Sequence, residues 1–426
     1  MLSAAAARLL ARNGIHYGWF MMMLTFGYVV CSAGVSNLQG VLLLPISQEL
    51  GWSIGDMSGP MGLRIALFGL IAPFAGALMM RYGPRAVLTL SAALLIAGLL
   101  LAMTMTAKWQ LWLGFGVLMG VAPGLTALVL PTLIATRWFT LRRGLVLGIM
   151  SAGMATGQMV FLTPGAWLAG HYGWRSALAP SVVMIGLLAL AFVLFSRNRP
   201  ADVGLPPYGE TAVLPDPPPT VDNPFVISLQ AARLASGSAV FWVLAFTFFV
   251  CGVSSFGVVP HFVALCGDFG ITPITSTSLL TLIGICDLFG TIGSGWLSDR
   301  YDNRWLLAIY YGFRGLSLMW LPYSDFTLVA LSGFAVFYGL DFIATLPPTA
   351  RMLVRAFGRE QGPVVFGWVF AAHQAGAGLM VTATGASRDV LASYLPAFFV
   401  AGVFCVLATL SLLMLRGRRG LAVQVA

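Results

Sequence analysis

One ten-residue segment of this chain occurs twice. Residues 76–85 (GALMMRYGPR) and, 219 positions later, residues 295–304 (GWLSDRYDNR) share the frame Gly-x-Leu-x-x-Arg-Tyr-x-x-Arg. Each copy directly follows an apolar stretch of helix length. A second pair, residues 137–139 (RWF) and 355–357 (RAF), repeats at nearly the same spacing. Two repeats in register across half the chain indicate that it contains two copies of one structural unit.

The composition identifies the environment of that unit. Hydrophobic residues make up 59% of the chain and charged residues only 9%, which is typical of integral membrane proteins and not of soluble domains. A helix needs about 20 apolar residues to cross a bilayer. Twelve apolar stretches approach or exceed that length, so we predict an all-α protein with two six-helix halves. The predicted spans are 19–45, 57–79, 86–105, 109–136, 144–169, 176–195, 239–265, 275–298, 305–322, 327–350, 363–386 and 395–415.

The basic residues predict the orientation, because Lys and Arg are retained on the cytoplasmic side of short loops. With both termini in the cytoplasm, eighteen arginines fall on that side, and only Lys108, Arg175 and Arg388 fall outside. The same asymmetry explains the net charge of +9 without a nucleic-acid partner.

The remaining segments separate the halves. Residues 196–238 contain a cluster of prolines that excludes a long helix. We expect a short surface helix within 225–234 and otherwise a tether between halves that move. The cysteines show no metal-like spacing, so no metal site is predicted. The predicted division is a cytoplasmic segment 1–18, a first half 19–195, a cytoplasmic loop 196–238, a second half 239–415 and a cytoplasmic tail 416–426.

The repeated loop resembles a known motif. A Gly-x-x-x-(Asp)-Arg-x-Gly-x-Arg loop after the second and eighth helices is the mark of the major facilitator superfamily, and the resemblance implies a twelve-helix secondary transporter. The first copy has Met80 where the family usually has Asp, so the conformational latch attributed to that acid should be weaker there. The second copy keeps Asp299. The resemblance implies a gating role for the loop residues Arg81, Arg85, Asp299, Arg300 and Arg304.

Simple electrostatics gives the loop arginines two additional roles. They can cap the negative ends of helices or pair with Asp299 and Asp302 across the seam between the halves. A third role is to signal topology alone.

Three further segments resemble the monocarboxylate and oxalate/formate branch of that superfamily. They are residues 17–19 (YGW), 50–52 (LGW) and 138–145, which include WF and RRGL. The branch typically carries a lysine in helix 1 and an Asp-x-x-x-Arg pair in helix 8. Here helix 1 has no lysine, and Asp287 is followed four residues on by Thr291.

Ionisable residues inside the spans are the candidate functional residues, because a charge at the bilayer centre costs about 2.5 to 3.5 kcal/mol or more. Four of them lie near mid-depth, Arg64 lies in the outer half of helix 2, and His261 lies near the outer mouth. The family resemblance implies that Asp341 and His373 face a central cavity and that Asp287 borders it. The six are Arg64, His261, Asp287, Arg314, Asp341 and His373.

Arg314 is expected to point at Asp287 or Asp341, either as a static ion pair or in contact with substrate. Asp341 precedes Pro347 and Pro348, where a broken helix would free backbone carbonyls. We hypothesise that Asp341 or Asp287 takes up a coupled proton; the alternative for Asp341 is a permanent pair with Arg314.

Three helix-1 and helix-2 side chains form a candidate anion site. Arg64 offers a carboxylate a bidentate fork and could lie level with Asn37 and Gln39. A fixed brace between the two helices is the alternative. His373 either contacts substrate or relays a proton, or it is a packing residue. His261 is predicted to act as a gate.

The sequence therefore predicts a proton-coupled symporter of a small organic anion, of the monocarboxylate class, that works by alternating access. A proton-driven exporter of drugs or metabolites is the alternative, although residues 163–165 (TPG) give only a fragment of the exporter motif in helix 5. Catalytic motifs are absent, so we predict no enzyme activity and no cofactor. The expected partners are the substrate, a proton and lipid, and the protein is expected to be a monomer. Because 22 of the 23 basic residues are arginine, which suggests a GC-rich bacterial genome, we expect it in a bacterial inner membrane.

Overall fold

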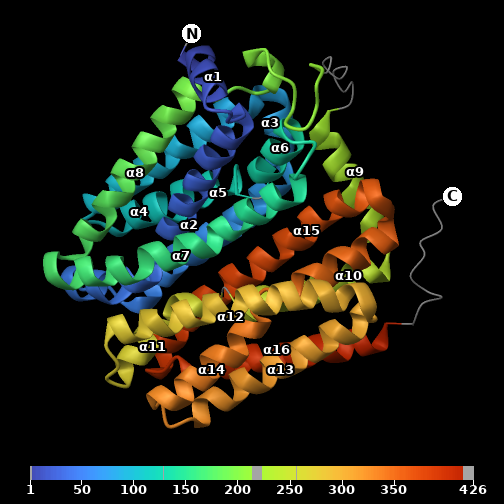
Figure 1. The fold of residues 1–426 in the computed structure, drawn as a ribbon. Coiled ribbons are helices and arrows are strands. Elements are labelled where there is room, and N and C mark those ends of the chain that lie inside the picture. Colours follow the sequence, from blue (N-terminus) through green and yellow to red (C-terminus); the bar gives the residue numbers. More distant parts are fainter. Residues whose placement is uncertain (1, 128, 214–222, 256, 416–426) are drawn as a thin grey trace.

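The computed structural model describes residues 2–127, 129–213, 223–255 and 257–415. Within these ranges the chain is almost entirely helical and has no β-sheet. Long helices run side by side in two bundles, which meet along a diagonal seam (Figure 1). The first bundle is drawn in blue to green and the second in yellow to red. The all-α membrane fold expected from the repeat is therefore confirmed.

The first half comprises the helices up to Phe195. The short helix α1 comes before the first membrane span. The fourth span is divided into α4, a π-helical turn η1, α5 and α6. The elements are α1 Leu2–Arg12, α2 Tyr17–Leu50, α3 Ile54–Met103, α4 Lys108–Leu111, η1 Trp112–Leu118, α5 Met119–Gly124, α6 Val129–Trp138, α7 Arg143–Tyr172 and α8 Trp174–Phe195.

The second half follows two short elements of the central loop, η2 Pro200–Val203 and α9 Pro224–Ser236. The elements of this half are α10 Ala239–Ser254, η3 Val259–His261, α11 Phe262–Asp268, α12 Pro273–Arg300, α13 Asn303–Trp320, η4 Leu321–Tyr323, α14 Leu328–Asp341, α15 Leu346–Leu391 and α16 Leu395–Met414.

Two of these helices each contain two spans. The backbone of α3 turns at Gly83 (φ 80°) and that of α15 turns at Gly358 (φ 81°), in a left-handed region that favours glycine. Among the described residues, eleven helical segments are long and apolar enough to cross a bilayer. Helix α13 is less apolar because it carries Arg304 and Arg314, and it occupies the position of the predicted ninth span.

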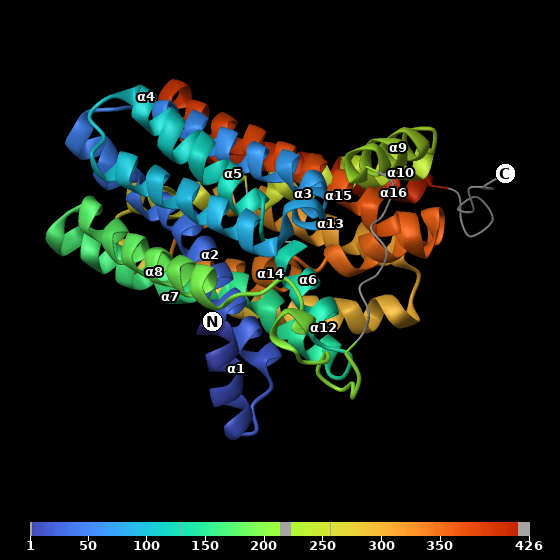
Figure 2. The same cartoon turned by 90° about the horizontal axis from the view of Figure 1, so that it is seen from above.

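Both ends of the described chain lie at one end of the bundle, together with α1 and α9 (Figures 1 and 2). We call this the terminus-side end and the other the opposite end. The short helix predicted within 225–234 is confirmed as α9. Phe225 of α9 stacks on Phe74 of α3, and Trp368 of α15 donates a 3.0 Å hydrogen bond to the carbonyl of Ser228. Helix α9 therefore touches both halves. The predicted tail 416–426, with its arginines, and loop residues 214–222 lie outside the described residues.

Glycines allow α3 and α15 to pack closely across the seam. Gly55, Gly62 and Gly69 recur every seven residues, two helical turns apart, and so share one face of α3. A Cβ on Gly62 would lie 3.3 Å from the carbonyl carbon of Gly378, and one on Gly69 would lie 2.8 Å from Cγ of Gln374. No larger side chain fits these positions, so the backbones of the two halves come into direct contact.

Candidate functional site: a cavity between the halves

A cavity of about 190 Å³ lies between the two halves. Its walls come from α2, α3, α5 and α7 of the first half and from α10, η3, α11, α12 and α15 of the second, together with the segment that joins α14 to α15. Most of the lining side chains are apolar or aromatic. Arg64 is the one lining residue with a permanent charge, and the described lining contains no carboxylate.

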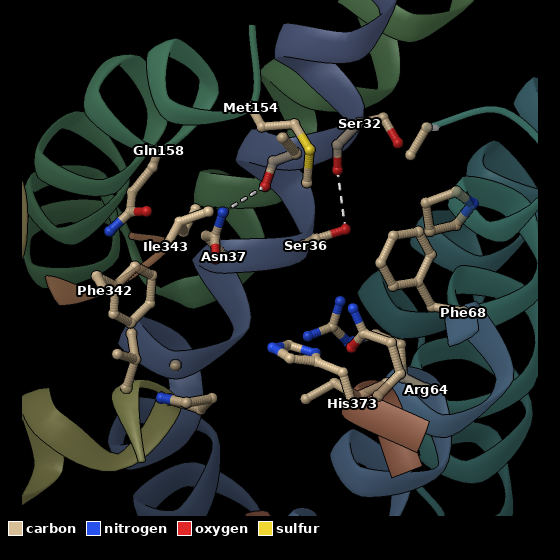
Figure 3. A pocket seen from close by; sticks show the side chains of 18 of the residues that line it. Ser32, Ser36, Asn37, Arg64, Phe68, Met154, Gln158, Phe342, Ile343 and His373 are labelled. Carbon is tan, nitrogen blue, oxygen red and sulfur yellow. Dashed lines mark hydrogen bonds between the residues drawn. The ribbon is translucent and has the colours of Figure 1, made fainter. Parts of the chain in front are cut away.

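Arg64 is the central polar feature of this cavity. Its side chain is only 9% exposed, and it makes no hydrogen bond or ion pair with any residue that the structure describes. Figure 3 shows its guanidinium pointing into the cavity beside the ring of His373. Arg64 comes from the first half and His373 from the second, and the close contact of α3 with α15 brings them together. A buried cation without a counter-ion is costly, so this site favours an anion.

Amide and hydroxyl groups line the wall formed by α2 and α7. The Asn37 side chain donates a 3.0 Å hydrogen bond to the Ala33 carbonyl. The amide oxygen of Asn37 is left facing the cavity (Figure 3). Gln158 lies on the same side as Asn37. Gln39, in contrast, does not line the cavity; it contacts the sulfur of Met119 at 3.9 Å. Side chains two residues apart on an α-helix point about 200° apart around its axis, so Asn37 and Gln39 cannot share a face.

The chain breaks its helix after Asp341, as the two prolines predicted. Helix α14 ends at Asp341 and α15 begins at Leu346. Arg314 satisfies the carbonyls freed by the break, because its Nη2 donates to the backbone oxygens of Asp341 and Phe342. Its Nε donates a 2.8 Å hydrogen bond to the Asp341 carboxylate. The predicted pairing of Arg314 with one of the two acids is therefore present, with Asp341 as the partner.

Arg314 does not reach the cavity, although substrate contact was one of its predicted roles. It is 1% exposed, and its Nη1 is occupied by Cys251 Sγ at 3.2 Å and Ser254 Oγ at 3.3 Å. Every nitrogen of the guanidinium thus has a partner. The arrangement is that of a structural ion pair that braces the broken helix.

Asp287 has a different environment. Its Oδ1 accepts hydrogen bonds from the backbone N–H of Ile343 at 2.9 Å and from the hydroxyl of Thr291 at 3.0 Å. It forms no ion pair with a described residue, and it is 8% exposed. Ile343 lines the cavity, so one peptide unit separates this carboxylate from the candidate binding site.

Hydrogen bonds between the halves close the opposite end of the cavity. His261 Nε2 lies 2.9 Å from the hydroxyl of Ser58, and both side chains are buried. Nearer the surface, the carboxylate of Asp389 accepts from Ser53 Oγ at 2.6 Å and from the N–H of Gly55 at 3.0 Å. His261 therefore lies in the seam and not at an open mouth.

The loop residues with a predicted gating role contact their own half. Arg85 caps α8 by donating to the carbonyl of Val193, and Arg304 caps α16 by donating to that of Leu415. Asp299 pairs with Arg351. The other two arginines lie over aromatic rings, Arg81 over Tyr82 at 5.4 Å and Arg300 over Trp296 at 4.0 Å. Arg85 and Arg304 thus follow the capping alternative. Asp299 and Asp302 do not pair across the seam, because both are engaged within the second half.

Sequence reasoning missed the aromatic lining and the interface glycines. Phe68, Phe342 and Phe370 line the cavity, but in a chain with 29 phenylalanines nothing local marks them. The seven-residue spacing of Gly55, Gly62 and Gly69 is visible in the sequence and would have predicted the helix that meets the other half.

A helical membrane fold of two bundles with a cavity between them is typical of one class of protein, the membrane transporters. The sequence model of the family described as the Major Facilitator Superfamily matches this chain twice, over residues 24–339 and 244–424. The chain therefore belongs to this superfamily, and it is a multi-pass membrane transporter of small molecules and not an enzyme.

Named relatives and solved structures agree with this assignment. Monocarboxylate transporter 13 of Rattus norvegicus is 28% identical over 396 residues, covering 91% of this chain and 86% of its own. The uncharacterized MFS-type transporter YcxA of Bacillus subtilis is 23% identical, covering 91% and 92%. The inward-open xylose transporter XylE of E. coli superimposes with a TM-score of 0.72 at 12% identity, covering 95% and 99%. The resemblance to the monocarboxylate branch is thus confirmed.

Proposed function

We propose that this chain carries a small organic anion of the monocarboxylate class together with a proton. The observation that carries the proposal is Arg64, a buried guanidinium that faces the cavity without a counter-ion. A carboxylate would supply the missing charge and accept two parallel hydrogen bonds. The similarity to monocarboxylate transporter 13 supports the same substrate class.

The proposal assigns the proton to Asp287 and not to Asp341. Asp341 is held by Arg314, whereas Asp287 has only neutral hydrogen-bond donors and can gain or lose a proton without breaking an ion pair. Its contact with the N–H of Ile343 links its charge state to the cavity wall. Uptake of one proton with one monoanion would be electroneutral.

The orientation belongs to the same proposal. Both termini would lie in the cytoplasm of a bacterial inner membrane, where the chain would act as a monomer. The contacts of His261 and Asp389 would then close the periplasmic side.

The test uses purified protein in liposomes with a pH dye inside. Lactate, pyruvate, acetate, oxalate and formate are added in turn, and protein-free liposomes correct for passive entry of the neutral acids. We expect saturable proton entry with at least one acid. Silence for all of them, from folded protein, would exclude these small acids as substrates. Silence for larger monocarboxylates as well would refute the anion symporter and favour the proton-driven export of larger amphipathic drugs or metabolites.

Two substitutions of Arg64 test the site itself. Arg64→Gln removes the charge and should raise the half-saturating concentration more than tenfold, because a hydrogen bond to a charged group contributes about 1.5 to 3 kcal/mol. Arg64→Lys keeps the charge and loses the fork, so we expect a smaller rise. Arg12→Gln, which removes an exposed arginine of α1, is the matched control. Unchanged saturation in Arg64→Lys would exclude the bidentate clamp.

Asp287→Asn tests the coupling. We expect this variant to exchange labelled substrate across the membrane while it no longer moves protons, because the amide cannot titrate. Asp325→Asn, at an exposed loop position, is the control. Normal acidification by Asp287→Asn would move the proton site elsewhere.

A further inference from the structure

We propose that the cavity is built for an aromatic monocarboxylate, with the carboxylate on Arg64 and the ring against Phe342. This inference rests on the proposed function and narrows its substrate class. It depends on the size of the cavity, the chemistry of its walls and the separation of Arg64 from Phe342.

The size of the cavity fits a ring better than a two- or three-carbon acid. Its volume is about 190 Å³. An apolar protein cavity of about 150 Å³ is large enough to bind benzene. The space here thus takes a phenyl ring with a short carboxylate arm. Acetate or formate would leave most of the apolar wall without a partner.

The walls have the chemistry that favours an aromatic ring. Phe68 of α3 and Phe370 of α15 meet edge to face with their centroids 5.7 Å apart. Phe370 in turn stacks on the ring of His373 at 5.8 Å, with the two planes within 4°. Phe248 of α10 lies 4.9 Å from the same imidazole. These rings come from both halves and all line the cavity, so a substrate ring would have aromatic edges and faces on several sides.

The cation of the cavity and Phe342 lie on different sides. Arg64 and His373 lie with Phe68 on one side of the cavity (Figure 3). Phe342 and Ile343 lie on the other side, with the amides of Asn37 and Gln158 nearby. The Phe342 side chain is only 6% exposed although it borders the cavity. An anion with one charged end and one apolar end matches this arrangement. A dicarboxylate would place its second charge against Phe342 and Ile343, where no described lining residue carries a positive charge.

Phe342 also connects the ring site to the broken helix. Its carbonyl accepts from Arg314, and the next residue, Ile343, donates its N–H to Asp287. A ring that presses on Phe342 therefore acts on the segment that holds the proposed proton site. A substrate too short to reach Phe342 would lack this contact.

The experiment measures displacement of radiolabelled phenylacetate from protein in lipid nanodiscs, which avoids passive permeation. The competitors are phenylacetate, cyclohexylacetate, acetate, lactate and the neutral phenylacetamide. We expect phenylacetate to displace the label at a concentration at least tenfold below that of acetate. Cyclohexylacetate, of similar size without the aromatic ring, should fall between them, and phenylacetamide should compete poorly because it lacks the charge.

Two variants locate the ring. Phe342→Leu should weaken phenylacetate binding several-fold more than acetate binding, because leucine keeps apolar volume but loses the aromatic face. Phe337→Leu changes an exposed phenylalanine of the neighbouring helix α14 and serves as the control. Equal losses in the two variants would place the ring elsewhere and overturn the assignment to Phe342.

The outcomes separate this inference from the proposed function. Binding of lactate or acetate as tight as that of phenylacetate, still dependent on Arg64, would overturn the aromatic site and leave the anion carrier standing. Phenylacetamide as effective as phenylacetate would overturn both. If the label does not bind, proton entry with lactate or acetate in liposomes would refute the aromatic site alone, and no response to any carboxylate would refute both.

Discussion

The buried pair of Arg314 and Asp341 gives the sharpest test of the structure. The guanidinium donates to the Asp341 carboxylate and to two carbonyls at the helix break, and it also contacts Cys251 and Ser254. Removing one partner of such a pair leaves a buried charge without compensation and costs about 3 to 5 kcal/mol. Asp341→Asn should therefore destabilise the second half by about this amount.

The two single variants should differ. A guanidinium cannot give up its proton, so Asp341→Asn leaves a permanent buried charge. Arg314→Gln leaves a carboxyl that can become neutral by taking up a proton, so its loss should be smaller. The double variant Arg314→Gln/Asp341→Asn is neutral and keeps an amide donor for the freed carbonyls. It should recover most of the stability that Asp341→Asn loses.

The assay is thermal unfolding of purified protein in detergent for the wild type, both single variants and the double variant. For a cooperative unit of about 150 to 250 residues, 1 kcal/mol shifts Tm by roughly 2 to 4 °C. A loss of about 3 kcal/mol thus predicts a Tm lower by roughly 6 to 12 °C for Asp341→Asn. The four values together give the interaction energy of the pair.

Two results would refute this reasoning. One is a Tm for Asp341→Asn within about 1 °C of the wild type, which would mean that the charge of Arg314 is compensated elsewhere. The other is a double variant no more stable than Asp341→Asn, which would mean that the two side chains act independently.

Two further predictions concern the seam. Gly62→Ala places a methyl group against the backbone of Gly378, so it should block closure at the opposite end and abolish transport in liposomes. Gly148→Ala is the control, because a Cβ there meets open space, and its transport should be unchanged. An active Gly62→Ala would contradict the close packing of α3 and α15. His261→Ala removes the hydrogen bond to Ser58, worth about 1 kcal/mol, and should raise the population open at the opposite end about fivefold. Labelling of a cysteine introduced at Ser53 checks this when it is compared with and without His261→Ala, because the lost contact with Asp389 is then common to both proteins. An unchanged rate would exclude a latch at His261.

The sequence by itself determined the class of fold and much of its division into elements. The repeated loop and the apolar stretches are local patterns, and a span of about 20 apolar residues has few alternatives to a membrane helix. The break after Asp341 was likewise predicted from Pro347 and Pro348, because proline cannot continue a helix without losing a hydrogen bond. These features depend on neighbours in the chain.

The tertiary structure decided which intramembrane charges belong together. From the sequence, Arg314 could pair with Asp287 or Asp341, and only the packing of α13 against α14 selects Asp341. Because of the same packing, Arg314 does not line the cavity, and Arg64 is the described lining residue with a positive charge. Helix rotation and the close approach of α3 to α15 fix which side chains face the cavity, and both depend on contacts between residues hundreds of positions apart.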